Sequence, residues 1–155
     1  MKSSSNLFKS ENSFTIPAEL LQEKPYVEIT NNIEISVWPE FIDKKSSILG
    51  EIYIWAYHVR IANNGLDEIQ LESRYWRILD EHGNIQEIEG EGVVGERPKI
   101  LPSASYQYSS GVHLKCQSGI MMGKYFMKNI NKNENFIVKI PNFSLDIPTN
   151  NKILN

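Results

Sequence analysis

Hydrophobic and polar residues alternate along most of this chain with a period of two, which is typical of β-strands buried on one face. The alternation begins near residue 26, and its first apolar phase consists of Ile33, Ile35 and Val37. We therefore expect one strand there, followed by a loop that starts at Pro39. Trp38 falls on the polar phase of this strand, so we expect it to contribute to an exposed patch.

Six further segments carry the same alternation and are predicted as strands: Ile52–Ile61, Glu68–Asp80, Ile85–Glu89, Ser105–Ser110, Gly123–Lys128 and Phe136–Leu145. Within the second of them the apolar phase changes side, which predicts a β-bulge near Ser73. Polar clusters typical of turns follow several of these segments, at Asn63–Gly65, His82–Asn84 and Asn131–Asn135.

Seven or so short strands without a long helical period predict an all-β domain. We expect an immunoglobulin-like or fibronectin type III-like β-sandwich, with a barrel as the alternative. Leu101-Pro102 precedes Tyr106 and Tyr108 in a pattern similar to the entry of a tyrosine corner, which is a feature of such sandwiches. The other interpretation is that both tyrosines are ordinary strand residues.

The 155 residues fit one domain with a core of its own. Because 19 acidic residues outnumber 16 scattered basic ones, we expect no nucleic-acid partner. The single cysteine, Cys116, fits a reducing compartment, so we expect a cytoplasmic protein. We expect no signal peptide, because the first 25 residues lack a continuous apolar h-region, and no membrane span, because no run of about 18 apolar residues occurs.

We divide the chain into an N-terminal extension (1–25), a domain (26–148) and a C-terminal tail (149–155). The extension is polar and rich in Ser and Asn, so we expect it to be mobile or loosely docked. Exposed edge strands in the sandwich are compatible with a homodimer.

A glycine-rich segment is the main functional candidate, because Gly90, Gly92 and Gly95 form a GxGxxG pattern. Pro98 and Pro102 follow closely and exclude the helix whose N-terminus would bind pyrophosphate in a dinucleotide-binding fold. Three interpretations remain open. The segment is a nest of backbone N–H groups for phosphate, a loop that contacts a protein, or a turn that needs positive φ angles.

Charged residues around the glycines extend this candidate surface. Acidic side chains in the segment oppose an anion unless Arg97, Arg74 or Lys99 offsets their charge. Arg74 could stack on Trp76 or bind a carboxylate, although a structural role is the alternative. The candidate binding residues are Gly90, Glu91, Gly92, Gly95, Glu96, Arg97, Arg74 and Trp76.

Metal and catalytic constellations are weaker. Three carboxylates alternate along one segment, at Glu87, Glu89 and Glu91. They could attract Mg²⁺, but they fit a solvated strand face better. His113 and Cys116 have HxxC spacing, yet two ligands do not make a zinc or cobalt site. Ser109 and Ser110 lie nearby without a nucleophile motif around them. We therefore predict no metal centre, no cofactor and no enzymatic activity.

Six segments in order resemble the bacterial ApaG family: YIWAYHVRIANNG, IQLESRYWRI, EIEGEGVVGERP, YQYSSG, GIMMGKYFM and FIVKIPNFSLDIP. The resemblance covers Tyr26 to Pro148 and implies a fibronectin type III-like, immunoglobulin-like β-sandwich. It also implies a role in interaction, because a related domain in some eukaryotic F-box proteins and in a polymerase-delta-interacting protein behaves as an interaction module. The chain departs from the family in its extension before Tyr26 and at Ser103, where members commonly have glycine.

The resemblance further implies an association with cobalt resistance and magnesium efflux. Such a link would be indirect, since we expect no membrane-spanning segment through which an ion could pass. We predict a non-enzymatic binding module that recognises an unidentified protein partner through the glycine-rich segment. The alternative is a small-ligand sensor that binds phosphate or pyrophosphate groups or divalent cations such as Mg²⁺ or Co²⁺.

Overall fold

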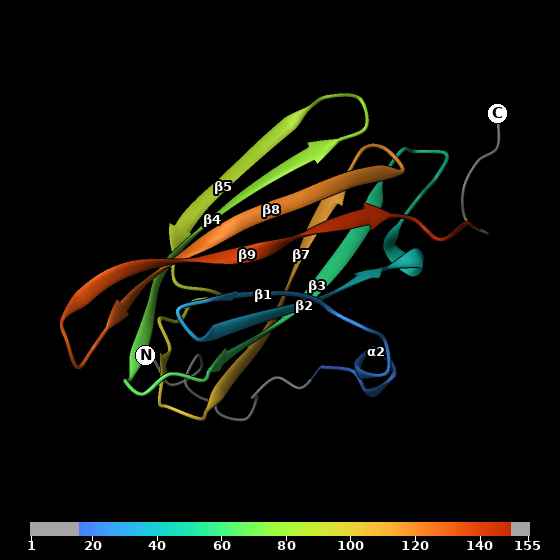
Figure 1. Ribbon diagram of the computed structural model, residues 1–155. Helices are drawn as coiled ribbons and strands as arrows, with labels where there is room; N and C mark the ends of the chain where they lie inside the picture. Colours follow the sequence, from blue (N-terminus) through green and yellow to red (C-terminus); the bar gives the residue numbers. More distant parts are fainter. Residues whose placement is uncertain (1–15, 150–155) are drawn as a thin grey trace, which may run out of the picture.

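The computed structural model describes residues 16–149, and strands make up most of this range (Figure 1). Nine strands in the described range form two antiparallel sheets that pack face to face. The protein is therefore an all-β sandwich of the immunoglobulin-like, fibronectin type III-like kind, which confirms the predicted fold class. No helix in this range is long and apolar enough to cross a membrane.

The first sheet contains, in spatial order, β1 (Tyr26–Thr30), β2 (Ile33–Phe41), β3 (Tyr53–Asn63) and β7 (Ser105–Leu114). The second contains β5 (Ile85–Glu91), β4 (Ile69–Asp80), β8 (Ser118–Asn129) and β9 (Glu134–Asp146). The short β6 (Lys99–Ile100) pairs with β4 beyond the end of β5. The helical elements are α2 (Ala18–Leu21) and the single 3₁₀ turn η1 (Asp43–Lys45).

The core lies between the two sheets and is built by alternating residues of both. The inward residues of β3, all at most 5% exposed, are Tyr53, Trp55, Tyr57, Val59 and Ile61. In β4 the register shifts between Leu71 and Ser73, which confirms the predicted bulge. In a regular strand, residues five apart face opposite sides. Because of this shift, Leu71 and Trp76 both point into the core.

The first predicted strand is in fact two strands. β1 and β2 form a hairpin whose two-residue turn, Asn31-Asn32, has both φ angles positive (50° and 65°). Asparagine tolerates this left-handed conformation better than most residues, so it can replace the glycine usually found there. The alternation of apolar residues resumes directly after the turn, which is why the sequence pattern did not reveal it.

The prediction that Pro39 starts a loop is also wrong, because β2 continues through Pro39 to Phe41. Pro39 pairs with Tyr57 of β3 on one side. On the other side the ladder with β1 ends two residues earlier, at the pair Tyr26 and Val37. Proline is tolerated in a strand at such an open edge, where its missing N–H interrupts no ladder.

Trp38 is buried rather than exposed, which corrects the expectation of an exposed patch. Its indole N–H donates a hydrogen bond to the carbonyl of Glu23 at 3.1 Å, and the guanidinium of Arg60 lies 5.2 Å from its ring. The described part of the predicted extension is therefore docked on the sandwich at Trp38. The rest of that extension, residues 1–15, and residues 150–155 of the predicted tail lie outside the described residues.

Of the two interpretations of Tyr106 and Tyr108, the structure supports ordinary strand residues over a tyrosine corner, because both hydroxyls bond to side chains. The hydroxyl of Tyr108 forms a hydrogen bond with that of Tyr125 in the opposite sheet. The hydroxyl of Tyr106 donates to Glu96 at 3.3 Å. Burial and the nearby carboxylate of Glu96 raise the pKa of Tyr106, which keeps this hydroxyl a donor.

Candidate functional site

The glycine-rich segment leaves β5 and closes on itself in a tight turn. Val93 and Glu96 exchange two backbone hydrogen bonds, of 2.8 and 2.9 Å. Val94 and Gly95 between them have positive φ angles of 41° and 80°, the pattern of a type I′ turn. Val93 is fully buried, whereas the side chain of Val94 is exposed at the tip. The segment is thus a protruding turn anchored in the core by its first valine.

Gly92 is required by the backbone geometry of this turn. Its φ angle is +59°, and a Cβ added there would lie 2.0 Å from the carbonyl oxygen of Glu96. No side chain fits at that distance without a change in the backbone. The prediction that the glycines serve turn geometry therefore has a physical basis at Gly92.

Arg74 supports the same turn from β4. Its Nη1 donates to the carbonyl oxygens of Glu91 (3.1 Å) and Gly92 (2.9 Å). A Cβ on Gly90 would lie 2.7 Å from this Nη1, so the guanidinium passes directly over Gly90. Gly90 and Glu91 belong to β5 rather than to the loop, which corrects the predicted end of that strand at Glu89. Arg74 is therefore brought to the loop as predicted, and its guanidinium supports the loop backbone.

Two further charged residues of the segment, Glu96 and Arg97, have partners within the protein. Arg97 forms an ion pair with Glu72 of β4, and Tyr106 donates to Glu96. The backbone N–H groups of Gly92, Val93 and Glu96 all donate to carbonyl oxygens of the protein. These groups therefore do not converge on a shared anion, which argues against the phosphate interpretation.

Trp76 is a core residue, which corrects its place among the candidate binding residues. It is completely buried, and its ring lies 5.1 Å from that of Tyr57 and 5.9 Å from that of Phe143. Arg74 and Trp76 are two residues apart in β4, but only Arg74 reaches the loop. The stacking of Arg74 on Trp76 is not needed to explain either position.

Replacing Val94 with asparagine is expected to raise the free energy of unfolding by about 1 kcal/mol, since a β-branched residue is strained at positive φ and Asn-Gly suits a type I′ turn. Urea unfolding followed by circular dichroism measures the change. The matched control is Val27→Asn in β1, an exposed strand position where asparagine is expected to bring no gain. A Val94→Asn variant no more stable than the original protein would contradict the strained turn.

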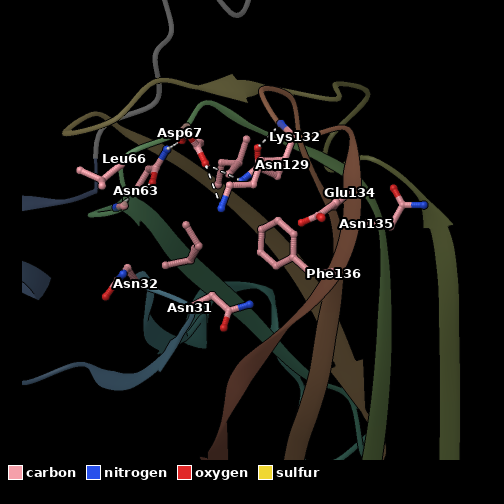
Figure 2. Close-up of a pocket in the computed structure, with 13 residues that line it drawn as sticks. Asn31, Asn32, Asn63, Leu66, Asp67, Asn129, Lys132, Glu134, Asn135 and Phe136 are labelled. Carbon is pink, nitrogen blue, oxygen red and sulfur yellow. Dashed lines mark hydrogen bonds and ion pairs between the residues drawn. The ribbon is translucent and has the colours of Figure 1, made fainter.

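A second site candidate, which the sequence did not indicate, is a pocket of about 400 Å³ at one end of the sandwich (Figure 2). Three turns line it: Asn31-Asn32 between β1 and β2, the loop after β3, and the β8–β9 hairpin. In the loop after β3, the Asp67 carboxylate accepts a hydrogen bond from the Asn129 amide (2.9 Å) and forms an ion pair with Lys132 (3.9 Å), both drawn in Figure 2. The only signal in the sequence is the repeated asparagine in turns, which also serves turn geometry alone.

The buried side chain of Asn63 holds the loop that lines this pocket. It is completely buried, and its amide nitrogen donates to the carbonyls of Asp67 (2.8 Å) and Ile100 (3.0 Å). Its amide oxygen accepts the N–H of Gly65 at 3.0 Å. One side chain thus links the end of β3, the following loop and β6.

A third cluster joins three strands on the outer face of the first sheet. His58 Nε2 lies 2.9 Å from the Glu40 carboxylate, and its Nδ1 contacts the Ser109 hydroxyl. Because a carboxylate only accepts, Nε2 carries the proton and Nδ1 accepts from Ser109. Hydrolases use the same three groups, but here they occupy neighbouring positions of β2, β3 and β7 on a sheet face, and their hydrogen bonds tie these strands together.

His113 and Cys116, the two residues with HxxC spacing that are by themselves insufficient for a metal site, do not share a ligand cluster in the described residues. The structure brings Cys116 together with Asp80 and His82, whereas His113 is exposed near the end of β7. The β4–β8 ladder causes this, because it places the end of β4 beside the start of β8.

The fold defines the class: a fibronectin type III-like β-sandwich whose loops project from a rigid core. Residues 43–129 match the ApaG domain family. The chain is 45% identical over 130 residues to Protein ApaG of Brucella suis biovar 1 (strain 1330), across 84% of this chain and 99% of that one. Protein ApaG of Brucella anthropi has the same identity and coverage. The chain therefore belongs to the ApaG family.

Solved structures agree with this assignment. The crystal structure of a Bordetella pertussis protein described as ApaA is 36% identical, with a TM-score of 0.74, over 81% of this chain and 98% of that one. A second X-ray structure, from a structural genomics consortium, is 37% identical with a TM-score of 0.73, over 83% of this chain and 95% of that one. Both share the β-sandwich described above.

Proposed function

We propose that this ApaG domain is a non-enzymatic protein-binding module and that the turn after β5 is its recognition element. Its surface comprises Gly90 and Glu91 at the end of β5 and Gly92, Gly95, Glu96 and Arg97 in the turn, with Val94 at the tip and Arg74 holding the backbone of Glu91 and Gly92. A cytoplasmic location is part of the proposal, because the single cysteine is a free thiol.

The observation that carries the proposal is the conformation of Val94. A β-branched residue at positive φ is a genuine outlier, and the side chain is 54% exposed, so packing inside the domain does not compensate for the strain. A strained apolar side chain presented on a rigid turn is well suited to insert into a partner's surface. Acidic residues and Arg97 around it would supply the polar rim.

Phosphate or cation sensing by this loop is not favoured as a second candidate. The N–H groups of Gly92, Val93 and Glu96 already donate to carbonyl oxygens of the protein, and the carboxylates of the loop repel an anion. Any connection to cobalt resistance or magnesium efflux would then be indirect and would pass through the protein partner.

The test compares proteins retained by the immobilised full-length chain with those retained by Val94→Asn and by Val27→Asn. Because Val94→Asn is expected to stabilise the fold, lost binding cannot be attributed to unfolding. We expect at least one stoichiometric interactor to be lost about tenfold or more, a difference of about 1.4 kcal/mol, with Val94→Asn and retained with Val27→Asn. Equal retention of every interactor by both variants would overturn the proposal.

A further inference from the structure

The hairpin at the far end of β5 from the recognition turn brings three different metal-binding side chains together. One ligand atom each of Asp80, His82 and Cys116 lies within 4.8 Å of the other two. Asp80 ends β4, His82 lies in the turn to β5, and Cys116 precedes β8. The β4–β8 ladder pairs Asp80 with Gly119, and Glu81 N donates to Ser118 O at 3.0 Å, so both turns are fixed side by side.

The carboxylate of Asp80 is held in place by its own turn. Its Oδ1 accepts the backbone N–H groups of His82 and Asn84, both at 2.9 Å, and its Oδ2 accepts from the amide of Asn84 at 3.1 Å. Since each carboxylate oxygen can accept twice, these bonds leave capacity on Oδ2 for a cation. Hydrogen bonds of this kind commonly orient the ligands of metal sites.

The other two ligands complement this fixed carboxylate. Cys116 is 5% exposed and so has a defined position, with its Sγ 3.7 Å from the carbonyl of Ser118. His82 is 65% exposed in its side chain, and its Nε2 lies 3.9 Å from a Glu81 oxygen. The imidazole can therefore adjust toward an ion, and Glu81 or water can provide a fourth ligand.

We propose that Asp80, His82 and Cys116 form a binding site for a divalent transition metal ion of the zinc type. An oxygen, a nitrogen and a sulfur ligand in one cluster fit this borderline ion and not Mg²⁺, which takes oxygen ligands. The thiol gives its proton to solvent on binding, and the thiolate and the carboxylate together neutralise the ion's two charges. The bound ion would clamp the β4–β5 turn to the β7–β8 turn.

Calorimetric titration of the chelator-treated full-length protein with ZnCl₂, in excess Mg²⁺, tests the site. We expect one ion per chain and at least tenfold weaker binding in His82→Ala, a variant that keeps its fold because His82 is exposed. His113→Ala is the matched control and is expected to bind as tightly as the original protein. Cd²⁺ titration adds a direct readout, since a thiolate ligand gives a charge-transfer absorbance that Cys116→Ser must abolish.

The chain contains three histidines and one cysteine, so these variants separate the alternatives. Absence of zinc binding, zinc binding unchanged in His82→Ala, or loss of binding in His113→Ala would each overturn the site. The proposal is independent of the recognition turn, because the Val94→Asn variant is expected to bind zinc normally.

Discussion

Replacing Trp76 with alanine is expected to lower the free energy of unfolding by about 3–5 kcal/mol, as the loss of a large core side chain does. The ring is completely buried between the sheets, edge-on to both Tyr57 and Phe143. Its removal opens a cavity that strands on both sides, fixed by their ladders, cannot close. Urea unfolding followed by far-ultraviolet circular dichroism measures the loss.

Two variants separate packing from other roles of this region. Trp76→Phe is expected to lose clearly less stability, because it keeps an aromatic ring and removes an indole N–H that is buried without a hydrogen-bond partner among the described residues. Arg74→Ala removes two hydrogen bonds to the turn and is expected to lose about 1–3 kcal/mol. A loss in Trp76→Ala smaller than that in Arg74→Ala would contradict the core position of this tryptophan.

The fold could be predicted from the sequence because alternation of apolar residues depends only on which face of a strand is buried. The phase change near Ser73 even located the bulge, since a bulge must move the apolar positions to the other parity. The hairpin at Asn31-Asn32 escaped detection because its turn residues keep the alternation on both sides intact. Ser103 is likewise a non-glycine residue at positive φ. Its φ angle is 69°, a conformation for which glycine is better suited.

The candidate site was predicted less well, because a linear pattern contains no information on depth or on contacts between strands. Arg74 and Trp76 fall on the same phase of one strand, and only the three-dimensional structure shows that one reaches the loop and the other the core. Trp38 was misjudged for a related reason. Its strand phase does point outward, but chain from the predicted extension covers it there.

Contacts between segments far apart in the chain could not be predicted from the sequence pattern. Cys116 could be paired only with the nearby His113 on the basis of spacing, whereas the β4–β8 ladder brings it to Asp80 and His82. The pocket in Figure 2 likewise depends on three turns that meet only after the sheets have packed. Both candidate sites therefore follow from topology, and the alternation of residues predicts only the strands that make that topology.

Replacing Asn63 with alanine is expected to lower the free energy of unfolding by about 3 kcal/mol, a large effect for so small a side chain. The carbonyls of Asp67 and Ile100 and the N–H of Gly65 would each lose their partner at this buried position. An unsatisfied buried polar group typically costs about 1–3 kcal/mol, and relaxation of the loop toward solvent recovers part of the sum. The comparison with the exposed neighbour Asn64→Ala, expected to stay within about 0.5 kcal/mol of the original protein, isolates burial from residue type.

Asn63→Asp distinguishes these hydrogen bonds from the loss of volume. An ionised aspartate has the same shape but turns an acceptor oxygen toward two carbonyl oxygens, so its pKa in the folded protein is raised above the unfolded value. The protonated form can still donate one hydrogen bond. Because the folded pKa is raised, the destabilisation is expected to grow as the pH rises through that pKa and to shrink as the pH falls. Equal stability of Asn63→Ala and Asn64→Ala, or an Asn63→Asp variant insensitive to pH beyond the original protein, would show that the amide does not hold the loop that lines the pocket in Figure 2.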